Sequence, residues 1–391
     1  QEAIIGVKFK DGDIVLDAGT TVKLELGPFT AVVENMGLSS KLTFPESGGN
    51  LGPADLAFSF KPPNGVGLSL DTPAVRGGGY LFFDPDNERY GGALELSIGS
   101  MFTVTAIGLI TTRLPDGSKG FSLLLMISVE FSPGFVLGMG FFLSGLGGLI
   151  GINRTMNENA LREAVLSGTV DNILFPQDVV ANITRIITDI RAIFPPKRDQ
   201  FLIGLMAKIT WGVPALVSIE FGLIIEFSSP VRLAILGVLK VALPTEEAAL
   251  VVIKVSFAGV INFDEKYLSF DASLFGSRIL TFTLEGDMAL RLNWGNEAAF
   301  LMSVGGFHPA FEPPARLNVG HLRRLTLNIL SGNPRLTLTT YMAVTSNTVQ
   351  FGASIDFYFA VSKFKVVGYF GFDVLFQFNP FRFLAGIRAG V

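Results

Sequence analysis

The chain offers few side chains whose spacing could support chemistry, and its two histidines are the first to consider. His308 lies within Gly305-Gly306-Phe307-His308-Pro309, and His321 is followed by Leu322 and two arginines. Neither histidine has a second histidine or an acidic residue at the spacing of metal ligands, so no metal site is predicted. The chain also lacks the Gly-x-Ser-x-Gly sequence of a nucleophile elbow, and one histidine in a loop does not define a catalytic triad. We predict no catalytic residue and no cofactor.

Three glutamates, Glu130, Glu220 and Glu226, stand inside otherwise apolar segments. A carboxyl group that points into a dry cavity has a raised pKa and could act as an acid catalyst. However, Glu220 and Glu226 occupy the parity that also carries lysine, serine and threonine. We therefore predict a structural role for them.

A glycine-rich run between residues 145 and 151 has the composition of a phosphate-binding loop. Such a loop ends in Gly-Lys-Ser/Thr, whereas here Asn153-Arg154-Thr155 follows. The run belongs to a stretch, 135–152, that carries no charge and is long enough for a membrane-spanning helix. Its six glycines weaken a helix, so we predict a strand over 135–143 followed by a tight structural turn over 144–151.

Composition indicates a large dry surface. Of 391 residues, 49% are hydrophobic and only 16% are charged, against about 25% charged residues in ordinary soluble domains. The chain has 36 Phe but only 6 Tyr and 2 Trp, and Phe lacks the polar group that suits Tyr and Trp to half-wet positions. The scarcity of Tyr and Trp also argues against an outer-membrane barrel, whose girdles are rich in both. The net charge of −4 without a basic stripe disfavours nucleic-acid binding, and the absence of cysteine excludes disulfides and thiolate sites.

The elements that carry these residues alternate at a period of two, which is the period of a β-strand. Every odd position from Phe201 to Phe227 is apolar, while the even positions include Lys208, Glu220 and Glu226. The same alternation recurs with odd parity over 251–263 and 351–361, and with even parity over 282–292 and 364–378.

Short polar loops separate these segments, which predicts an antiparallel meander. We expect roughly sixteen to twenty strands, more than the ten or so that an open sheet usually holds. We therefore predict a mainly β fold whose sheet curls into a barrel-like or two-layer structure.

One segment, 156–194, has a helical period instead. Residues 157–166 predict a short helix, and 177–192 predict a second one with an apolar stripe that Pro195 and Pro196 terminate. We expect this inserted pair of amphipathic helices to cover the apolar face of the sheet as a lid or plug. The apolar stripe of the second predicted helix consists of Val179, Ile183, Ile186, Ile187 and Ile190.

Residues 1–75 have shorter and more polar segments with frequent Gly and Pro, so we expect a smaller β portion there and a large meander over 76–391. The chain begins without Met and ends inside a strand-like segment. We therefore expect it to be part of a longer polypeptide, and no compartment is predicted.

Two segments, Leu143 to Arg154 and Gly305 to Phe311, resemble stretches of a family of very large, β-rich microbial proteins catalogued only as a domain of unknown function. The resemblance covers roughly residues 75 to 391. It implies a long β-meander within a larger polypeptide and brings no activity with it.

From these residues we predict a non-enzymatic module whose apolar interior binds a lipid or another hydrophobic small molecule. Two alternatives stay open: a structural or interaction module of a large assembly whose interior is fully packed, with other parts of a larger polypeptide as its partners, and an enzyme acting on a terpene-like apolar substrate in the cavity. The predicted lining residues are Trp211, Phe221, Phe227, Phe257, Phe282, Phe357, Phe359, Phe370, Phe372 and Phe376.

Overall fold

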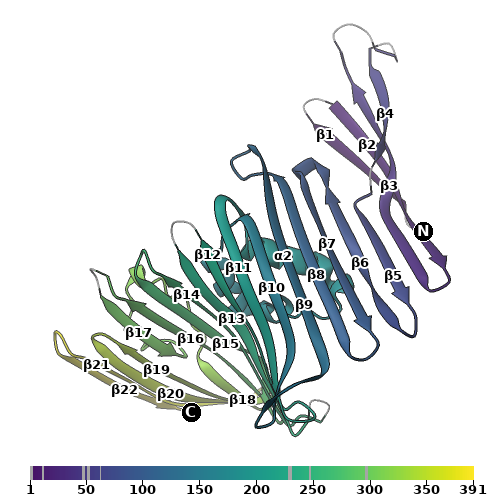
Figure 1. The fold of residues 1–391 in the computed structure, drawn as a ribbon. Helices are drawn as coiled ribbons and strands as arrows, with labels where there is room; N and C mark the ends of the chain where they lie inside the picture. The colour runs from purple at the N-terminus through teal and green to yellow at the C-terminus, as the bar shows by residue number, and fades with distance from the viewer. Residues whose placement is uncertain are drawn as a thin grey trace.

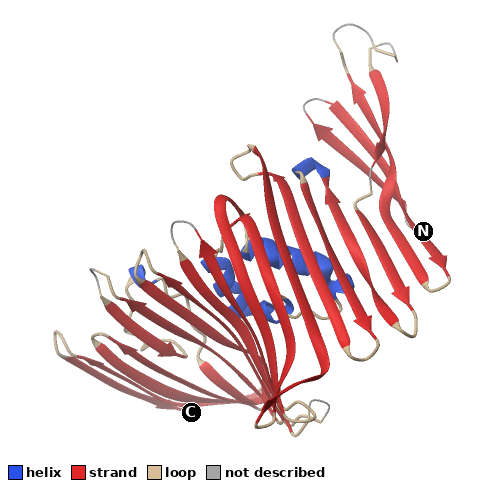
Figure 2. Cartoon of the chain, in the orientation of Figure 1, coloured by secondary structure: helices blue, strands red, loops and turns tan. Residues whose placement is uncertain are grey.

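The structure is a computed structural model that describes residues 3–10, 13–45, 49–50, 53–61, 63–227, 231–245, 248–295 and 298–391. Within these residues the chain forms one antiparallel sheet of 22 strands with two α-helices (Figures 1 and 2). Among the described residues, β1 pairs only with β2, β4 only with β3 and β22 only with β21, so these three strands lie at edges of an open sheet. The predicted antiparallel meander with an inserted helical pair is confirmed.

The strands follow one another along the chain. They are β1 (Ala3–Lys10), β2 (Asp13–Leu26), β3 (Phe29–Thr43), β4 (Asp55–Lys61), β5 (Gly65–Asp71), β6 (Val75–Asp84), β7 (Arg89–Ile98), β8 (Phe102–Arg113), β9 (Lys119–Gly138), β10 (Phe141–Arg154), β11 (Pro196–Trp211), β12 (Val217–Phe227), β13 (Arg232–Leu243), β14 (Val251–Asn262), β15 (Tyr267–Ile279), β16 (Phe282–Asn293), β17 (Ala299–Val304), β18 (Leu325–Ser331), β19 (Arg335–Thr345), β20 (Thr348–Val361), β21 (Phe364–Gln377) and β22 (Arg382–Gly390). The helices are α1 (Glu158–Ser167) and α2 (Val179–Ile193), with short 3-10 turns η1 (Pro85–Asn87), η2 (Thr169–Asn172) and η3 (Ala315–Leu317).

Almost every strand pairs with the strands before and after it in the chain. The exceptions lie near the two ends. β3 pairs with both β4 and β5, and β17 and β18 share the place between β16 and β19. β-Bulges at several positions, including the β15 segment between Leu274 and Ser277, change the parity of a strand along its length.

The helical segment follows β10 and returns to β11. α1 begins where the side chain of Asn157 accepts hydrogen bonds from the amides of Asn159 and Ala160, and it ends at Gly168 in the left-handed conformation. The first amide of α2, that of Val179, donates to Oε2 of Glu95 on β7 at 3.0 Å. A carboxylate of the sheet therefore fixes the N-terminus of this helix.

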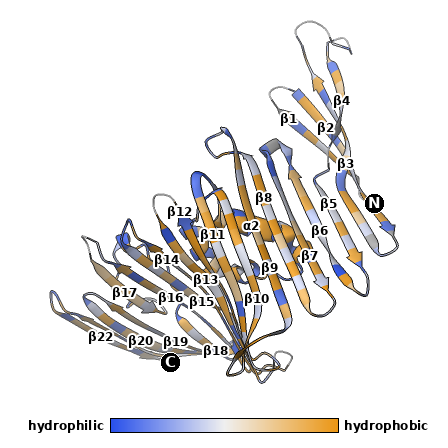
Figure 3. Ribbon diagram, in the orientation of Figure 1, coloured by the Kyte–Doolittle hydropathy of each residue, from blue (hydrophilic) through white to orange (hydrophobic). Residues whose placement is uncertain are grey.

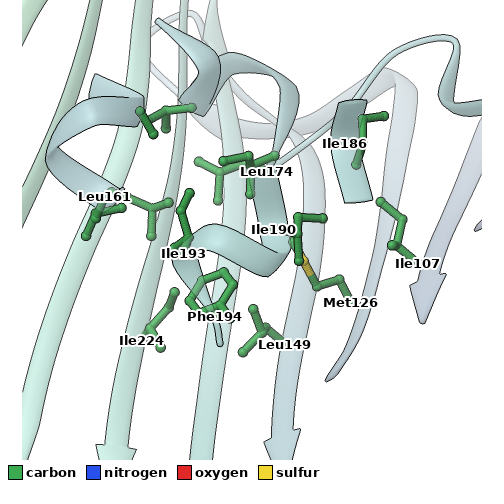
Figure 4. Packing of buried hydrophobic residues seen from close by; sticks show 14 of the residues in the cluster. Ile107, Met126, Leu149, Leu161, Leu174, Ile186, Ile190, Ile193, Phe194 and Ile224 are labelled. Carbon is green, nitrogen blue, oxygen red and sulfur yellow. The ribbon is translucent and has the colours of Figure 1, made fainter. Parts of the chain in front are cut away.

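The hydrophobic core lies between this helical segment and the middle of the sheet. Ile186, Ile190 and Phe194 from α2 and its end pack over Met126 of β9 and Leu149 of β10 (Figure 4). α2 contacts β6 and β7, whereas α1 contacts β14 and β15, so the segment spans the sheet from one to the other. Figure 2 shows the two helices on a single side of the sheet.

One local prediction is wrong. The glycine-rich run 145–151 is not a turn, because it lies within β10 and pairs residue by residue with β9 on one side and β11 on the other. The absence of a side chain at Gly145 lets the helical segment approach: a Cβ atom at Gly145 would lie 2.9 Å from the ring of Phe175. The strand over 135–143 was predicted correctly in type, but a turn at 139–140 divides it between β9 and β10.

β1 to β5 belong to the same sheet as the remaining strands. Whether residues 1–75 form a separate portion stays a prediction. Among the residues that the structure describes, neither α-helix is long and apolar enough to cross a membrane; α2, the longer one, has 15 residues.

Candidate ligand-binding face

The two faces of the sheet differ in what covers them. We call the face under the helices the covered face and the opposite one the uncovered face. Neighbouring residues of β11 show the difference: Leu202 is 0% exposed on the covered face, whereas Ile203 is 50% exposed on the uncovered face. Strand alternation carries this division along the whole sheet.

The strand pairing places one continuous row of apolar residues on the uncovered face. Direct partners link β5 to β22 without a break, so the row crosses nearly the whole sheet. Its members are Leu70, Gly77, Leu96, Val104, Val129, Leu146, Ala207, Phe221, Gly237, Phe257, Ala272, Met288, Val304, Met342, Phe351, Val374 and Ala385. Figure 3 shows the matching alternation of hydrophobic and polar residues along β8 to β11.

Charge is absent from this face over most of its length. From β5 to β22, the described positions that strand pairing places on the uncovered face carry no Asp, Glu, Lys or Arg. With strands about 4.8 Å apart and a rise of about 3.4 Å per residue, the face measures roughly 75 by 35 Å. This far exceeds the roughly 300–600 Å² of the largest apolar patch on a typical monomer.

All ten predicted lining residues fall on the uncovered face. The parities read from the sequence are confirmed as one face, because direct pairs link the segments, such as Phe201 with Phe227, Leu268 with Leu292, and Phe351 with Val374. Trp211, Phe227 and Phe370 are exposed, and the other seven are half-buried. Trp211 also packs beside Phe141 of β10, and its Nε1 donates to the carbonyl oxygen of Met139 at 3.1 Å. Their role in binding stays a prediction.

The expectation that the helices cover this apolar face is wrong. Val179, Ile183, Ile186, Ile187 and Ile190 are buried as predicted, but against the covered face and not against the lining residues. α2 is therefore no lid over the predicted lining.

The physical reason for the correction lies in the even positions of the strands. Leu202, Met206 and Ile224 offer apolar surface there, interleaved with glycines that leave room for the helices. The charged residues of the same face serve as partners for charged residues of the helical segment. The face with mixed composition can thus satisfy both kinds of side chain, which a purely apolar face cannot.

Glu220 illustrates this role. Its Oε1 lies 3.1 Å from Nζ of Lys208 and 3.6 Å from Nζ of Lys240, and Lys240 also pairs with Asp171 of η2. Lys208 lies 2.6 Å from Glu130 as well. Burial lowers the pKa of Lys208, but the two carboxylates outweigh it and the pKa is raised. The lysine therefore stays charged among its acidic partners, and the structural role predicted for Glu220 fits this arrangement.

A second network joins Glu226, which is fully buried, to the start of the helical segment. Arg232 approaches Glu226 at 2.5 Å and Glu158 of α1 at 2.9 Å, and it donates to the carbonyl oxygen of Met156 at 3.0 Å. The hydroxyl of Thr155 donates to Glu226 at 2.5 Å. Each charge is paired and hydrogen-bonded, as burial requires.

The long connection 305–324 packs on the covered face further along the sheet. The sequence analysis did not predict this contact. Arg291 of β16 makes a paired contact with Asp271 at 2.8 and 3.1 Å and also donates to the carbonyl oxygen of Leu317 in η3 at 3.1 Å. The amide of His308 donates to Oε1 of Gln350 at 2.9 Å. His308, which was singled out in the sequence, thus holds a loop in place.

The uncovered face contains one hollow of ligand size, which we call the glycine hollow. Its floor is formed by Gly79, Gly92 and Gly108, where β6, β7 and β8 lack side chains and Gly92 pairs directly with Gly108. Its volume is about 560 Å³, which lies within the 300–1,000 Å³ of typical ligand pockets. The surrounding side chains are Val66, Leu68, Leu81, Phe83, Tyr90, Leu94, Ile110, Leu123 and Leu125.

None of the hollow's residues was among the predicted lining. The predicted lining consists of Phe and Trp residues, whereas the hollow arises from glycines on neighbouring strands. A signal was available, since 77–79 is a run of three glycines and glycines recur at 91–92 and 108 within apolar segments. Only the register shows that three of these glycines, Gly79, Gly92 and Gly108, meet on one face.

The fold and this face define an open antiparallel β-sheet protein with a helical layer on one face and an exposed apolar surface on the other. The chain belongs to a family of unknown function, DUF6603, whose model matches residues 3–391. The resemblance noted for residues 75 to 391 is thereby confirmed as membership of a family of unknown function, and the match extends over the N-terminal strands. No curated protein and no solved structure matches the chain.

Proposed function

We propose that this protein binds a lipid, or another ligand with a hydrocarbon chain, on the uncovered face, with the glycine hollow as its deepest point. The proposal rests on the hollow of about 560 Å³. The hollow lies on a face whose described strand-paired positions carry no charged residue from β5 to β22. A hydrocarbon chain has no hydrogen bonds to satisfy and loses none when it leaves water.

The energetics favour a chain-like ligand. Each methylene that leaves water contributes about 0.8 kcal/mol, so removing four methylenes from a bound chain lowers the affinity by roughly 200-fold at full burial. A ligand that relied on polar contacts would find few partners here, because the lining carries no charged residue and its hydroxyls are those of Tyr80 and Tyr90, of which Tyr80 already donates to Glu34 at 2.8 Å. We therefore expect affinity to follow chain length and to depend little on the polar group.

The experiment fills the hollow. A Cβ atom built at Gly108 has no neighbour within 4 Å, so Gly108→Leu places a side chain in the space without a clash. Gly148→Leu is the matched control, because Gly148 lies on the same face in β10, outside the hollow, with its nearest atom at 3.5 Å. Fatty acids of increasing length are titrated into delipidated protein by calorimetry.

We expect Gly108→Leu to weaken binding at least about tenfold, which corresponds to about 1.4 kcal/mol, and Gly148→Leu to leave it unchanged. Equal binding by all three proteins, or affinity independent of chain length, contradicts the proposal.

A second proposal rests on the extent of the face. Roughly 2,500 Å² of uninterrupted apolar surface is several times the roughly 800 Å² that each partner contributes to a standard protein interface. We propose as the alternative that another β-rich segment of a larger polypeptide packs on this face, as two sheets do in a sandwich. The enzymatic alternative gains no support, because the paired positions of this face from β5 to β22 carry no acid to start a reaction. Fatty-acid titration of delipidated protein that light scattering shows to be a monomer separates the two proposals: a monomer that binds fatty acids favours the ligand, and one that binds none favours the packed interface.

A further inference from the structure

A second cavity lies on the covered side, at one end of β7, β8 and β10. Its volume is about 400 Å³. Four arginines line it, two from the strands β7 and β8, one from the end of β10 and one from α2, and no Asp or Glu is among the lining residues. The lining consists of Asn87, Arg89, Thr111, Arg113, Leu114, Pro115, Gly117, Arg154, Arg191 and Pro196. In a chain whose net charge is −4, such a concentration of guanidinium groups calls for an anion.

Arg154 is the clearest sign of a missing partner. Its side chain is only 1% exposed, and its Nη1 donates to the carbonyl oxygen of Phe194 at 2.8 Å. Its Nε is buried without a hydrogen-bond partner, and no described carboxylate pairs with it. Buried charges in proteins are normally paired. Burial, together with the nearby Arg191, lowers the pKa of Arg154 to about 10.

The other arginines reinforce this picture. The guanidinium group of Arg191 of α2 lies 5.2 Å from the centre of the Phe82 ring. Burial and the positive charge of Arg89 lower the pKa of Arg191, and the negative charge of Asp84 offsets part of this decrease. The carboxylate of Asp84 accepts hydrogen bonds from Asn87. Among the described residues, Arg113 is the only one of the four arginines that forms an ion pair, with Glu88 at 2.8 Å. The cavity thus holds an excess of positive charge next to an unused buried donor.

We infer that this arginine cavity binds a phosphate group. Guanidinium groups form paired, charge-assisted hydrogen bonds to phosphate oxygens, and a dianion matches several arginines better than a single carboxylate does. The Nε of Arg154 and the guanidinium groups of Arg191 and Arg89 would supply the donors. This site is independent of the proposed function, since it lies on the other side of the sheet from the glycine hollow.

The phosphate could be a free anion or the head group of a lipid. The two cavities adjoin the same strand ends: Arg89 and Thr111 line the arginine cavity, while their chain neighbours Tyr90 and Ile110 line the hollow. The test therefore has two arms. Inorganic phosphate is titrated into the full chain by calorimetry at constant ionic strength, and flotation measures binding to phosphatidylcholine vesicles with and without phosphatidic acid.

The variants are Arg191→Gln and Arg89→Gln, because Arg154→Gln alters a fully buried position and endangers folding. Arg185→Gln is the matched control: it makes the same change on α2, where Arg185 contacts Asn172 and Asn182 instead of the cavity. We expect each cavity variant to weaken phosphate binding by about tenfold or more, and the control to leave it unchanged. Thermal unfolding of every variant in chloride buffer verifies folding.

Binding of inorganic phosphate that the cavity variants lose supports a free-anion site. Binding only to phosphatidic acid vesicles, lost in Arg191→Gln but kept in Gly108→Leu, supports a lipid phosphate at the same site. The inference is overturned if neither arm shows binding, or if Arg185→Gln reduces binding as much as Arg191→Gln does.

Discussion

Two neighbouring residues of β11 provide a direct perturbation of the face assignment. Leu202 is 0% exposed beneath the helical segment, and Ile203, next in the chain, is 50% exposed on the uncovered face. Leu202→Ala and Ile203→Ala each remove most of an aliphatic side chain from the same strand. The backbone surroundings are shared, so the difference between the two variants reports on what covers each face.

The expected magnitudes follow from burial. Truncating a fully buried leucine costs about 3–5 kcal/mol, because transfer and cavity terms add. Full burial of an isoleucine contributes about 1.5–3 kcal/mol, and half of that surface is still in water at position 203, so its truncation costs about 1 kcal/mol. We therefore expect Leu202→Ala to be more destabilising by about 2 kcal/mol or more.

The assay is urea unfolding of delipidated protein, followed by far-ultraviolet circular dichroism and by the fluorescence of Trp211 and Trp294. Free energies are compared from midpoint shifts at a common slope. An Ile203→Ala variant that loses as much stability as Leu202→Ala would refute the assignment, because it would place position 203 in a dry core.

Two further predictions use the same unfolding assay. Glu226→Gln leaves Arg232, whose side chain is 12% exposed, with Glu158 as its remaining carboxylate, so we expect a stability loss of about 3 kcal/mol or more; a loss below about 1 kcal/mol would contradict the buried pairing of Glu226. The pKa of His308 is lowered from 6.5, mainly by burial. The positive charges of Arg324 and Arg382 lower it further, and the negative charge of Asp373 raises it. The unfolded chain then binds the proton more readily, so stability is full above pH 6.5 and falls as the pH drops toward the folded pKa. His308→Gln should remove that part of the pH dependence, and an unchanged slope would contradict it.

Alternation in the sequence was sufficient to predict the strands, because side chains of a strand point to opposite sides whatever lies above them. It also placed Phe221, Phe257 and Phe372 on one face before any register was known. Alternation could not show which face the helices cover. That choice depends on pairs far apart in the chain, such as Arg232 with Glu158 and Lys240 with Asp171.

The structural roles of the glycines were harder to predict from the sequence. Gly145 was predicted to lie in a turn, yet it lies within β10 and leaves room for Phe175 of the helical segment. Gly92 and Gly108 pair directly on neighbouring strands, and their pairing opens the hollow. The arginine cavity could not be predicted from the sequence either, because Arg89, Arg154 and Arg191 belong to three elements that only the fold brings together.

The central claim is that hydrocarbon chains bind on the uncovered face at the glycine hollow, and photolabelling tests it most directly. A fatty acid with a photoreactive group at the end of its chain is bound, activated by light and located by mass spectrometry of peptides. We predict labels on β7, β8 and β9 at residues such as Leu94, Ile110 and Leu123, and their loss in Gly108→Leu. Labels on α1 or α2, or a pattern that Gly108→Leu leaves unchanged, would contradict the account.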